Sequence, residues 1–349
     1  MVRHGRDASV PHVLHVERGA LEQVASILAR SHLPMGRILL LTGRGATAAY
    51  GAVVARGLAG TTDVARETVG AASHVEVARL LDVANSAGTT LVIGIGGGRV
   101  LDVAKSLAYL CAADLALVPT AISHDGVSSP VASLIDGAGR RVSVGAATPA
   151  AVIVDTDVVR SAPPQTLRAG LGDVLSNLSA IEDWRLADAR NADVFDGYSA
   201  LLADSAARSL LMIGDLTQDA GIELLARSVV MSGVAMVAAG TSRPCSGAEH
   251  LISHSLDERL GSRARLHGEQ VALGTLVSFG ARGGQPTGLR ETFAGSGLPL
   301  SPGDLDLPID LLIEAIMKAP STRPERYTVL DEIDLSWRAV GELVERTFS

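Results

Sequence analysis

Residue types that bind catalytic metal ions are concentrated in the second half of the sequence. Asp173 stands near the expected start of a helix, His250 and His254 lie four residues apart on one helical face, and His267 opens a further helical segment. One carboxylate and two imidazoles would leave a coordination position open for water or a substrate oxygen, as in catalytic rather than structural sites. A single histidine in a helical segment more often packs or caps the helix than binds a metal. Together these residues predict a metal site. They leave open whether His254 binds the metal itself or only contacts a residue that does.

A second chemical signal is the glycine run Gly96-Gly97-Gly98, which follows an apolar segment and opens a helical one. Glycines let the backbone approach a phosphate closely, and the free N–H groups of a helix start bind its charge. The spacing matches neither the dinucleotide fingerprint nor the Walker A loop. A plain strand-to-helix turn is the competing interpretation, in which Asp102 is a first-turn acid and Lys105 pairs with it.

The elements that would position these residues fall into two halves. Four short apolar runs, at 37–43, 89–95, 114–119 and 151–155, alternate with helical patterns at 76–87 and 100–111. Unalternating apolar runs are typical of strands buried on both faces of a parallel sheet, and ligands bind at the carboxyl ends of such strands. A glycine turn at 136–139 between two further runs, 131–135 and 140–145, predicts a hairpin.

After about Val159 the strand signals stop, and alanine- and leucine-rich helical stretches follow at 167–190, 199–213, 219–239, 246–257 and 266–280. The sequence therefore predicts an α/β protein: an N-terminal doubly wound, Rossmann-like parallel sheet and an all-helical C-terminal domain. We expect a dinucleotide-binding domain over 1–159 and a helical metal- and substrate-binding domain over 160–349.

Composition limits the classes of partner. The 349 residues are 47% hydrophobic and 19% charged with a net charge of −8, which gives no basic surface for nucleic acid. The two cysteines, Cys111 and Cys245, suggest neither a disulfide framework nor a cysteine metal site. Because the sequence shows neither a signal peptide nor a run of roughly 18 apolar residues, we expect a cytoplasmic protein without a membrane span. Apolar helices in the second half favour a homo-oligomer.

Taken together, the motifs resemble the sn-glycerol-1-phosphate dehydrogenase family, a branch of the superfamily that holds iron-containing alcohol dehydrogenases, glycerol dehydrogenase and 3-dehydroquinate synthase. Six matching segments run in family order from about residue 37 to 330: 96–105, 118–126, 169–173, 242–250, 267–270 and 326–330. Arg99, Cys245 and Ala248 depart from the family pattern, and the first 20 residues match nothing in it.

The resemblance implies a role for each matching residue. Asp173, His250 and His267 would hold one divalent metal ion, with zinc favoured over iron or nickel. Asp125 and His254 would contact the substrate, which Asp173 also faces. These three residues would be the catalytic residues. NAD or NADP would be bound by residues of two segments and one serine: Gly96, Gly97, Gly98, Arg99, Val100, Leu101 and Asp102, then Thr120, Ala121, Ile122 and Ser123, and Ser129.

Two differences separate this chain from neighbouring branches. Dehydroquinate synthases use Glu where this chain has Asp173, and glycerol dehydrogenases carry another pattern at 123–127. The resemblance therefore implies reduction of dihydroxyacetone phosphate to sn-glycerol 1-phosphate, a step in phospholipid metabolism, with a small phosphorylated ketone or polyol as substrate. The alternatives within the superfamily are a polyol dehydrogenase and a sugar-phosphate cyclase. A non-catalytic ligand-binding relative is a further alternative, but such a protein would have to lack the metal site, whose three ligand types this sequence keeps.

Overall fold

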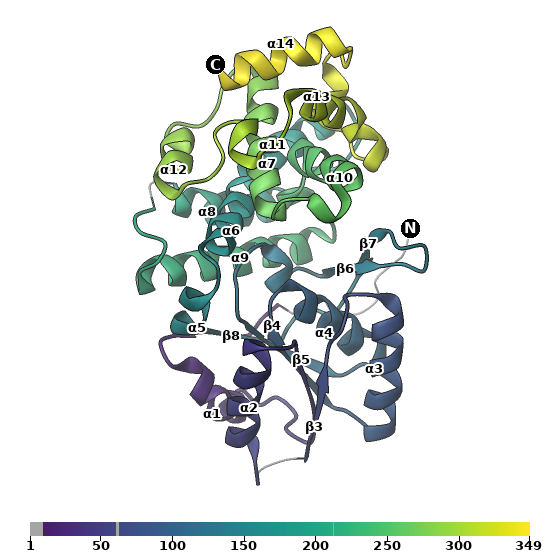
Figure 1. Cartoon of the computed structure of the whole chain (residues 1–349), viewed down its shortest axis with the longest axis vertical. Helices are drawn as coiled ribbons and strands as arrows, with labels where there is room; N and C mark the ends of the chain where they lie inside the picture. Colours follow the sequence, from purple (N-terminus) through teal and green to yellow (C-terminus); the bar gives the residue numbers. More distant parts are fainter. Residues whose placement is uncertain (1–9, 61–62, 212) are drawn as a thin grey trace. The chain divides into compact units, whose positions relative to one another are not determined.

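The computed structural model describes residues 10–60, 63–211 and 213–349, which form two compact units. Of these described residues, unit 1 takes those within Met1–Ile122 and Gly126–Ala162, and unit 2 takes those within Ser123–Asp125 and Pro163–Ser349. The first unit is built on strands and helices, the second on helices (Figure 1). The predicted α/β fold with a helical second half is confirmed.

A six-stranded parallel sheet in the order β1-β8-β5-β4-β2-β3 forms the centre of unit 1. Its strands are β1 (Val13–Glu17), β2 (Arg37–Thr42), β3 (Asp63–Thr68), β4 (Leu91–Gly96), β5 (Asp114–Pro119) and β8 (Ala151–Asp155). The helices of this unit are α1 (Ala20–Arg30), α2 (Ala46–Leu58), α3 (His74–Ala87), α4 (Gly98–Cys111) and α5 (Thr156–Ser161). The predicted hairpin is also present, as β6 (Val131–Ile135) and β7 (Arg141–Gly145), paired antiparallel.

Helices cover both faces of the sheet, as a doubly wound fold requires. α1 and α2 pack on the face that carries Ile93 and Ile95, in one apolar cluster. Gly94, which points to the other face, packs against Ala104 of α4 so closely that an added Cβ would lie 2.7 Å from the Ala104 Cβ. Figure 1 shows α1 and α2 on one side of the strands and α3 and α4 on the other.

Two strands of the sheet, β1 and β3, were not predicted from the sequence. Both lie at its edges, where each pairs with a single neighbour. β3 mixes polar and apolar residues, because an edge strand is only partly buried. The rule that found the central strands, an unbroken apolar run, does not apply to it.

Unit 2 is built from nine α-helices and several short 3-10 turns over 163–211 and 213–349. The helices are α6 (Pro164–Leu175), α7 (Asn177–Ala189), α8 (Gly197–Leu210), α9 (Asp219–Ala239), α10 (Ala248–Leu260), α11 (His267–Arg282), α12 (Leu289–Ser296), α13 (Ile309–Lys318) and α14 (Trp337–Phe348). The 3-10 turns are η2 (Arg243–Cys245), η3 (Gly261–Arg263), η4 (Pro302–Leu305), η5 (Ala319–Thr322) and η6 (Val329–Glu332), while η1 (Asp125–Val127) lies where the chain passes between the units.

The single helix predicted over 167–190 is two helices, and this expectation was wrong. α6 ends at Leu175 and α7 begins at Asn177, with Ser176 between them. The Ser176 hydroxyl donates to the backbone oxygen of Asp173 at 2.6 Å, a local bond that competes with regular helix geometry.

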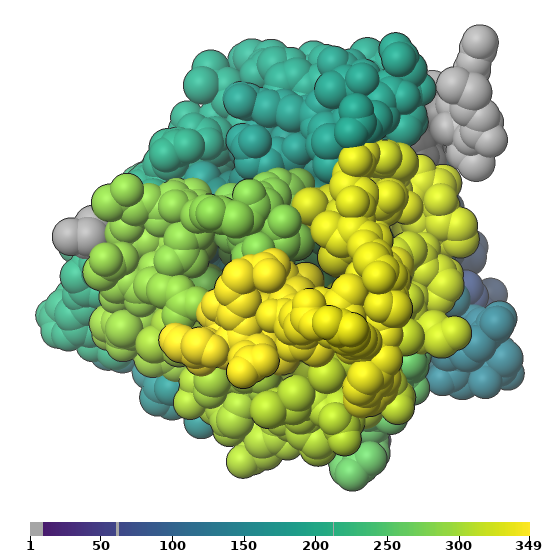
Figure 2. Space-filling view, turned by 90° about the horizontal axis from the view of Figure 1, so that it is seen from above, coloured from purple at the N-terminus to yellow at the C-terminus, as the bar shows by residue number. Residues whose placement is uncertain are grey.

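The main apolar core of unit 2 joins α10, α11, α13 and α14. Figure 2 shows the C-terminal residues, drawn in yellow, on the surface of this unit. One described helix, α9, is long and apolar enough to cross a membrane, but 56% of its most apolar window is buried inside the protein, which is typical of a core helix.

Candidate functional site

The candidate metal site depends on an unusually close approach of α6 and α11. A Cβ added to Gly268 would lie 1.8 Å from the backbone oxygen of Ala169, and one added to Gly172 would lie 2.4 Å from the backbone oxygen of Gly268. Only glycine permits this spacing. Asp173 and His267 are the residues beside these glycines, so the helix contact brings their side chains together.

α10 supplies the third donor, and its start is fixed by buried carboxylates. The amide of Ala248 donates to Oδ2 of Asp183 at 2.7 Å, and the amide of Gly247 donates to Oε1 of Glu249. Free N–H groups at a helix start are stabilised by such acceptors. His250 follows in the first turn of this helix.

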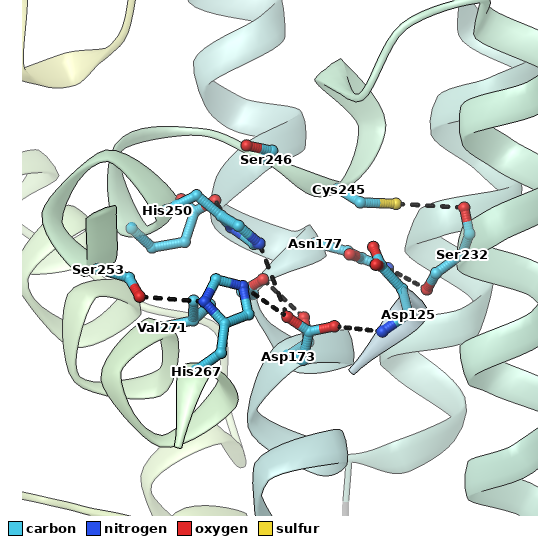
Figure 3. Close-up of polar contacts among 12 residues, drawn as sticks. Asp125, Asp173, Asn177, Ser232, Cys245, Ser246, His250, Ser253, His267 and Val271 are labelled. Atoms are coloured by element: carbon cyan, nitrogen blue, oxygen red, sulfur yellow. Dashed lines mark hydrogen bonds and ion pairs between the residues drawn. The ribbon is translucent and has the colours of Figure 1, made fainter. Parts of the chain in front are cut away.

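Asp173, His250 and His267 place one ligand atom each within 4.8 Å of one another (Figure 3). Oδ1 of Asp173 lies 3.6 Å from Nε2 of His250 and 3.7 Å from Nε2 of His267. Both distances are longer than a hydrogen bond. The buried Oδ1 of Asp173 has no hydrogen-bond partner among the described residues. A buried carboxylate oxygen facing two imidazole nitrogens fits a divalent metal, because the ion would satisfy all three.

Each donor is oriented by a further hydrogen bond. Nδ1 of His250 donates to Oε1 of Glu249 at 3.1 Å, and Nδ1 of His267 is hydrogen-bonded to the Ser253 hydroxyl at 3.2 Å. Oδ2 of Asp173 accepts from the backbone amide of Asp125 at 2.7 Å. Partners of this kind set the tautomer and direction of metal-binding side chains.

The pKa values of the two histidine donors are shifted in opposite directions. Burial disfavours the charged form of His250, but the nearby carboxylates of Asp173 and Glu249 outweigh it and raise the pKa of His250 to about 9. Burial lowers the pKa of His267 to about 3, and the nearby charge of His250 adds to this decrease. The two imidazoles therefore differ in charge at physiological pH. Two carboxylates stabilise the charged form of His250, whereas His267 is neutral.

The other predicted substrate residues lie around this group. The ring of His254 stacks on that of His267, with 6.0 Å between centroids, and lies 6.4 Å from that of His250. Asp125 approaches Asp173 through its backbone, as described above. His124, which the sequence analysis did not select, has its ring 6.4 Å from that of His267.

Three further polar residues near the donors were also missed. Glu249 is fully buried and accepts from the Ser179 hydroxyl at 2.8 Å as well as from His250. Asn177 and Ser246 are buried, and each leaves one side-chain oxygen without a partner among the described residues. Figure 3 shows both beside the donor group. The sequence signals were the position of Asn177, four residues after Asp173, and the place of Ser246 and Glu249 within the matching segment 242–250.

The predicted dinucleotide residues of the glycine turn belong to unit 1, where Gly96 ends β4 and Gly97 precedes α4. A Cβ on Gly96 would lie 2.6 Å from the Val100 side chain, so the strand-to-helix turn is tight. No side-chain hydrogen bond caps the helix, and the amides of Val100 and Leu101 donate to the backbone oxygen of Gly97, which leaves the amides of Gly98 and Arg99 available for an anion. Thr120, at the end of the adjacent strand, donates its amide to the backbone oxygen of Gly96 at 3.0 Å.

Asp102 and Lys105 form a buried ion pair, with 3.3 Å between Oδ1 and Nζ. The Lys105 ammonium also donates to the backbone oxygens of Ser129 and Val131, which ties α4 to β6. Arg99 is exposed on the first turn and donates to the backbone oxygen of Gly70 at 3.4 Å.

The remaining predicted dinucleotide residues divide between the units. Val100 and Leu101 are buried in α4, and Ser129 is buried with its hydroxyl donating to the backbone oxygen of Val131 at 3.3 Å. Ala121 is half-buried and Ile122 is buried, and both belong to unit 1, whereas Ser123 belongs to unit 2.

Comparison with known proteins finds relatives over nearly the whole chain. The pattern of the family described as iron-containing alcohol dehydrogenase matches residues 15–163. The glycerol-1-phosphate dehydrogenase (NAD(P)+) of Hyperthermus butylicus is 36% identical, covering 97% of this chain and 97% of that protein. The enzyme of the same name from Methanosarcina mazei is 37% identical over 92% of this chain and 90% of its own length.

Solved structures share the fold at lower identity. The glycerol dehydrogenase of Schizosaccharomyces pombe aligns with a TM-score of 0.79 at 21% identity, covering 98% of this chain and 90% of that one.

Proposed function

Since the chain belongs to the glycerol-1-phosphate dehydrogenase family, we propose that it reduces dihydroxyacetone phosphate to sn-glycerol 1-phosphate with NADH or NADPH. The observation that carries the proposal is the buried Oδ1 of Asp173, which faces Nε2 of His250 and of His267 and has no partner among the described residues. Zinc is the metal we expect there, with iron or nickel as alternatives.

Asp173, His250 and His267 would hold the metal. When bound, the ion would polarise the substrate carbonyl and stabilise the negative charge that develops on its oxygen. The chain prepares this site in advance: Glu249 orients His250, Ser253 orients His267, and the Asp125 amide orients Asp173.

The reaction transfers a hydride from the reduced nicotinamide to the carbonyl carbon and a proton to the carbonyl oxygen, which leaves NAD(P)+. In this proposal the first amides of α4 bind the cofactor pyrophosphate. The Asp125 side chain and His254 orient substrate hydroxyls and relay the proton. Burial lowers the pKa of His254 well below its usual value, with the Arg323 charge adding to this effect, so its imidazole is neutral, with one ring nitrogen that donates a hydrogen bond and one that accepts.

The test is a metal-dependent turnover assay. Protein stripped with a chelator and reloaded with zinc should oxidise NADH or NADPH only when dihydroxyacetone phosphate is present. Asp173→Ala should abolish both zinc binding and turnover, while Asp125→Ala should keep the zinc and lose turnover, because its backbone amide still reaches Asp173.

Two outcomes would contradict the proposal or its assignments. Absence of zinc-dependent turnover by the wild type would overturn the reaction, and equal loss of zinc in both variants would overturn the roles. A sugar-phosphate cyclase would give product without net consumption of reduced cofactor, and a polyol dehydrogenase would prefer an unphosphorylated substrate. We also expect a cytoplasmic homo-oligomer, which fractionation and light scattering would test.

A further inference from the structure

The sheet of unit 1 has a point at which its crossover connections diverge. In the order β5-β4-β2-β3, the chain leaves β4 through α4 toward β5 and leaves β2 through α2 toward β3. α2 and α4 therefore follow neighbouring strands but cover opposite faces of the sheet (Figure 1). In open parallel sheets, ligands bind at the carboxyl ends of the strands at such a point. We therefore expect the dinucleotide at the carboxyl ends of β2 and β4.

The two segments that follow these strands are in contact. Gly43-Arg44-Gly45 follows β2, and the turn after β4 leads into the amides that we propose bind the pyrophosphate. A Cβ added to Gly43 would lie 3.5 Å from Cγ2 of Val100, in the first turn of α4. The turn that contains Arg44 therefore lies beside the proposed pyrophosphate site.

The direction of the cofactor follows from the chain connection after β5, the strand on the other side of β4. That connection runs through Thr120 to Asp125, whose amide donates to Asp173 of the proposed metal site. The nicotinamide has to reach the substrate at the metal, so it belongs on the β5 side of the pyrophosphate. The adenosine half then belongs on the opposite side, at the carboxyl ends of β2 and β3.

Arg99 reaches toward this adenosine side. It is exposed in the first turn of α4, and its Nη1 donates at 3.4 Å to the backbone oxygen of Gly70, two residues after β3. Because β2 lies between β4 and β3, a side chain that starts after β4 and reaches Gly70 spans the carboxyl end of β2. Arg99 is also one of the departures from the family pattern, so cofactor binding as such does not require it.

Acids that would favour NAD are missing from the same place. Dinucleotide sites that prefer NAD hold the ribose 2′-hydroxyl with an Asp or Glu, whereas an arginine accommodates the 2′-phosphate of NADP. The sequence has no acid over 43–60, and Arg44 is exposed and pairs with no acid among the described residues. Glu67 of β3 and Glu76 of α3 are both paired with Arg79.

We propose that Arg99 and Arg44 bind the 2′-phosphate of NADP, and that the chain therefore prefers NADPH to NADH. A phosphate monoester carries close to two negative charges at neutral pH, which matches two cations. Guanidinium groups bind phosphate oxygens in a paired, directional way. The inference rests on the proposed function for the position of the cofactor, but cofactor binding can be measured without the reaction.

The experiment measures cofactor binding to the zinc-loaded protein in the absence of substrate. Fluorescence titration with NADPH and with NADH gives the two dissociation constants, and calorimetry with adenosine 2′,5′-bisphosphate and with 5′-AMP tests the adenosine end alone. The wild type should bind NADPH at least about 10-fold more tightly than NADH, and the bisphosphate more tightly than 5′-AMP.

Two variants separate the 2′-phosphate from the rest of the cofactor. Arg99→Gln should weaken NADPH binding by about 10-fold, the loss typical of one charged hydrogen bond, and should change NADH binding by less than about threefold. Arg44→Asp should reverse the preference, because a carboxylate at this turn would bind the ribose hydroxyl and repel the 2′-phosphate.

Arg56→Gln is the matched control, because it removes the same charge from an exposed residue in the last turn of α2, at the end of that helix away from the turn. Both of its dissociation constants should stay within about twofold of the wild-type values. Thermal unfolding should be the same in all variants.

Three results would overturn the inference. The first is wild-type protein that binds NADH as tightly as NADPH. The second is an equal loss of affinity for both cofactors in Arg99→Gln, because Arg99 would then bind a group that the cofactors share. The third is an Arg44→Asp protein that keeps the preference for NADPH.

The outcome for the reaction is separate. If the wild type binds NADPH selectively but does not reduce dihydroxyacetone phosphate, the 2′-phosphate site stands and the proposed reaction fails.

Discussion

Glu249 connects the metal donors to the interior of unit 2. It is fully buried, it accepts from His250 and from the Ser179 hydroxyl, and its neighbours hold its pKa below the usual value although burial opposes ionisation. A charged acceptor behind an imidazole increases the basicity of the nitrogen on the other side of the ring. Glu249 is therefore part of the proposed metal site although it does not face the metal position.

Replacing this carboxylate by an amide tests that role. Glu249→Gln should reduce zinc affinity by roughly 10–100-fold, because His250 loses its charged partner while the residue keeps its size. Competition with a chromophoric chelator measures the affinity. Glu258→Gln, an exposed position on the same helix, is the control and should bind zinc as the wild type does. Equal affinity in the two variants would remove Glu249 from the site.

At the residue scale, the sequence predicted the group of donors better than its surroundings. Type and spacing selected Asp173, His250, His254 and His267, and the family resemblance then separated His254 from the three donors, which the structure brings together. Glu249 and Ser246 were not selected, because Glu and Ser are common in helices and loops and become distinctive only when they are buried away from solvent. That information arises from contacts between segments roughly 80 residues apart, such as that of Ser246 with Arg326.

At the element scale, the contact between α6 and α11 decides whether the donors meet. Gly268→Ala should destabilise the protein by about 2 kcal/mol, because its methyl group would overlap the backbone of α6 and force the helices apart. Zinc affinity should fall as well, because Asp173 and His267 would separate. Denaturant unfolding and chelator competition would measure the two effects.

Gly284→Ala is the control for this prediction. Gly284 follows α11, and an added Cβ there would meet no atom within 4 Å. Its effect on stability should stay within about 0.5 kcal/mol. A Gly268→Ala protein with wild-type stability and zinc affinity would show that the helices can separate without cost.

The elements themselves were predictable in proportion to their burial. β2, β4, β5 and β8, whose apolar runs were recognised, occupy adjacent places in the sheet order, while the unrecognised β1 and β3 lie at the edges. The order of strands was not predictable, since it depends on which helix covers which face. The break at Ser176 was missed because serine occurs in helices and interrupts one only when its hydroxyl finds a nearby acceptor.

At the scale of the whole molecule, each unit has its own apolar core, one around the sheet and one around α10 and α11. A metal bound by unit 2 should therefore raise the free energy of unfolding of that unit. Free zinc at about 100 times its dissociation constant adds about 2.7 kcal/mol, which corresponds to roughly 5–10 °C in midpoint for a unit of this size. Calorimetry with zinc and with chelator measures the shift.

Asp173→Ala provides the control for this measurement. Its unfolding should not respond to zinc, and the step that belongs to unit 1 should be the same in all samples. A zinc-dependent shift that persists in Asp173→Ala protein would place the stabilising metal elsewhere.

Ser123–Asp125, a stretch of three residues, is assigned to unit 2 although the chain on both sides of it belongs to unit 1. The two units are therefore not interchangeable modules. A chimera that joins the first 162 residues of a relative to the helical unit of this chain would take residues 124 and 125 from the relative. Residue 125 is the one whose backbone amide orients Asp173. Recombination aimed at changing cofactor preference would therefore also exchange His124, whose ring lies 6.4 Å from that of His267, and the proposed substrate residue Asp125, unless the breakpoints also exclude this short stretch.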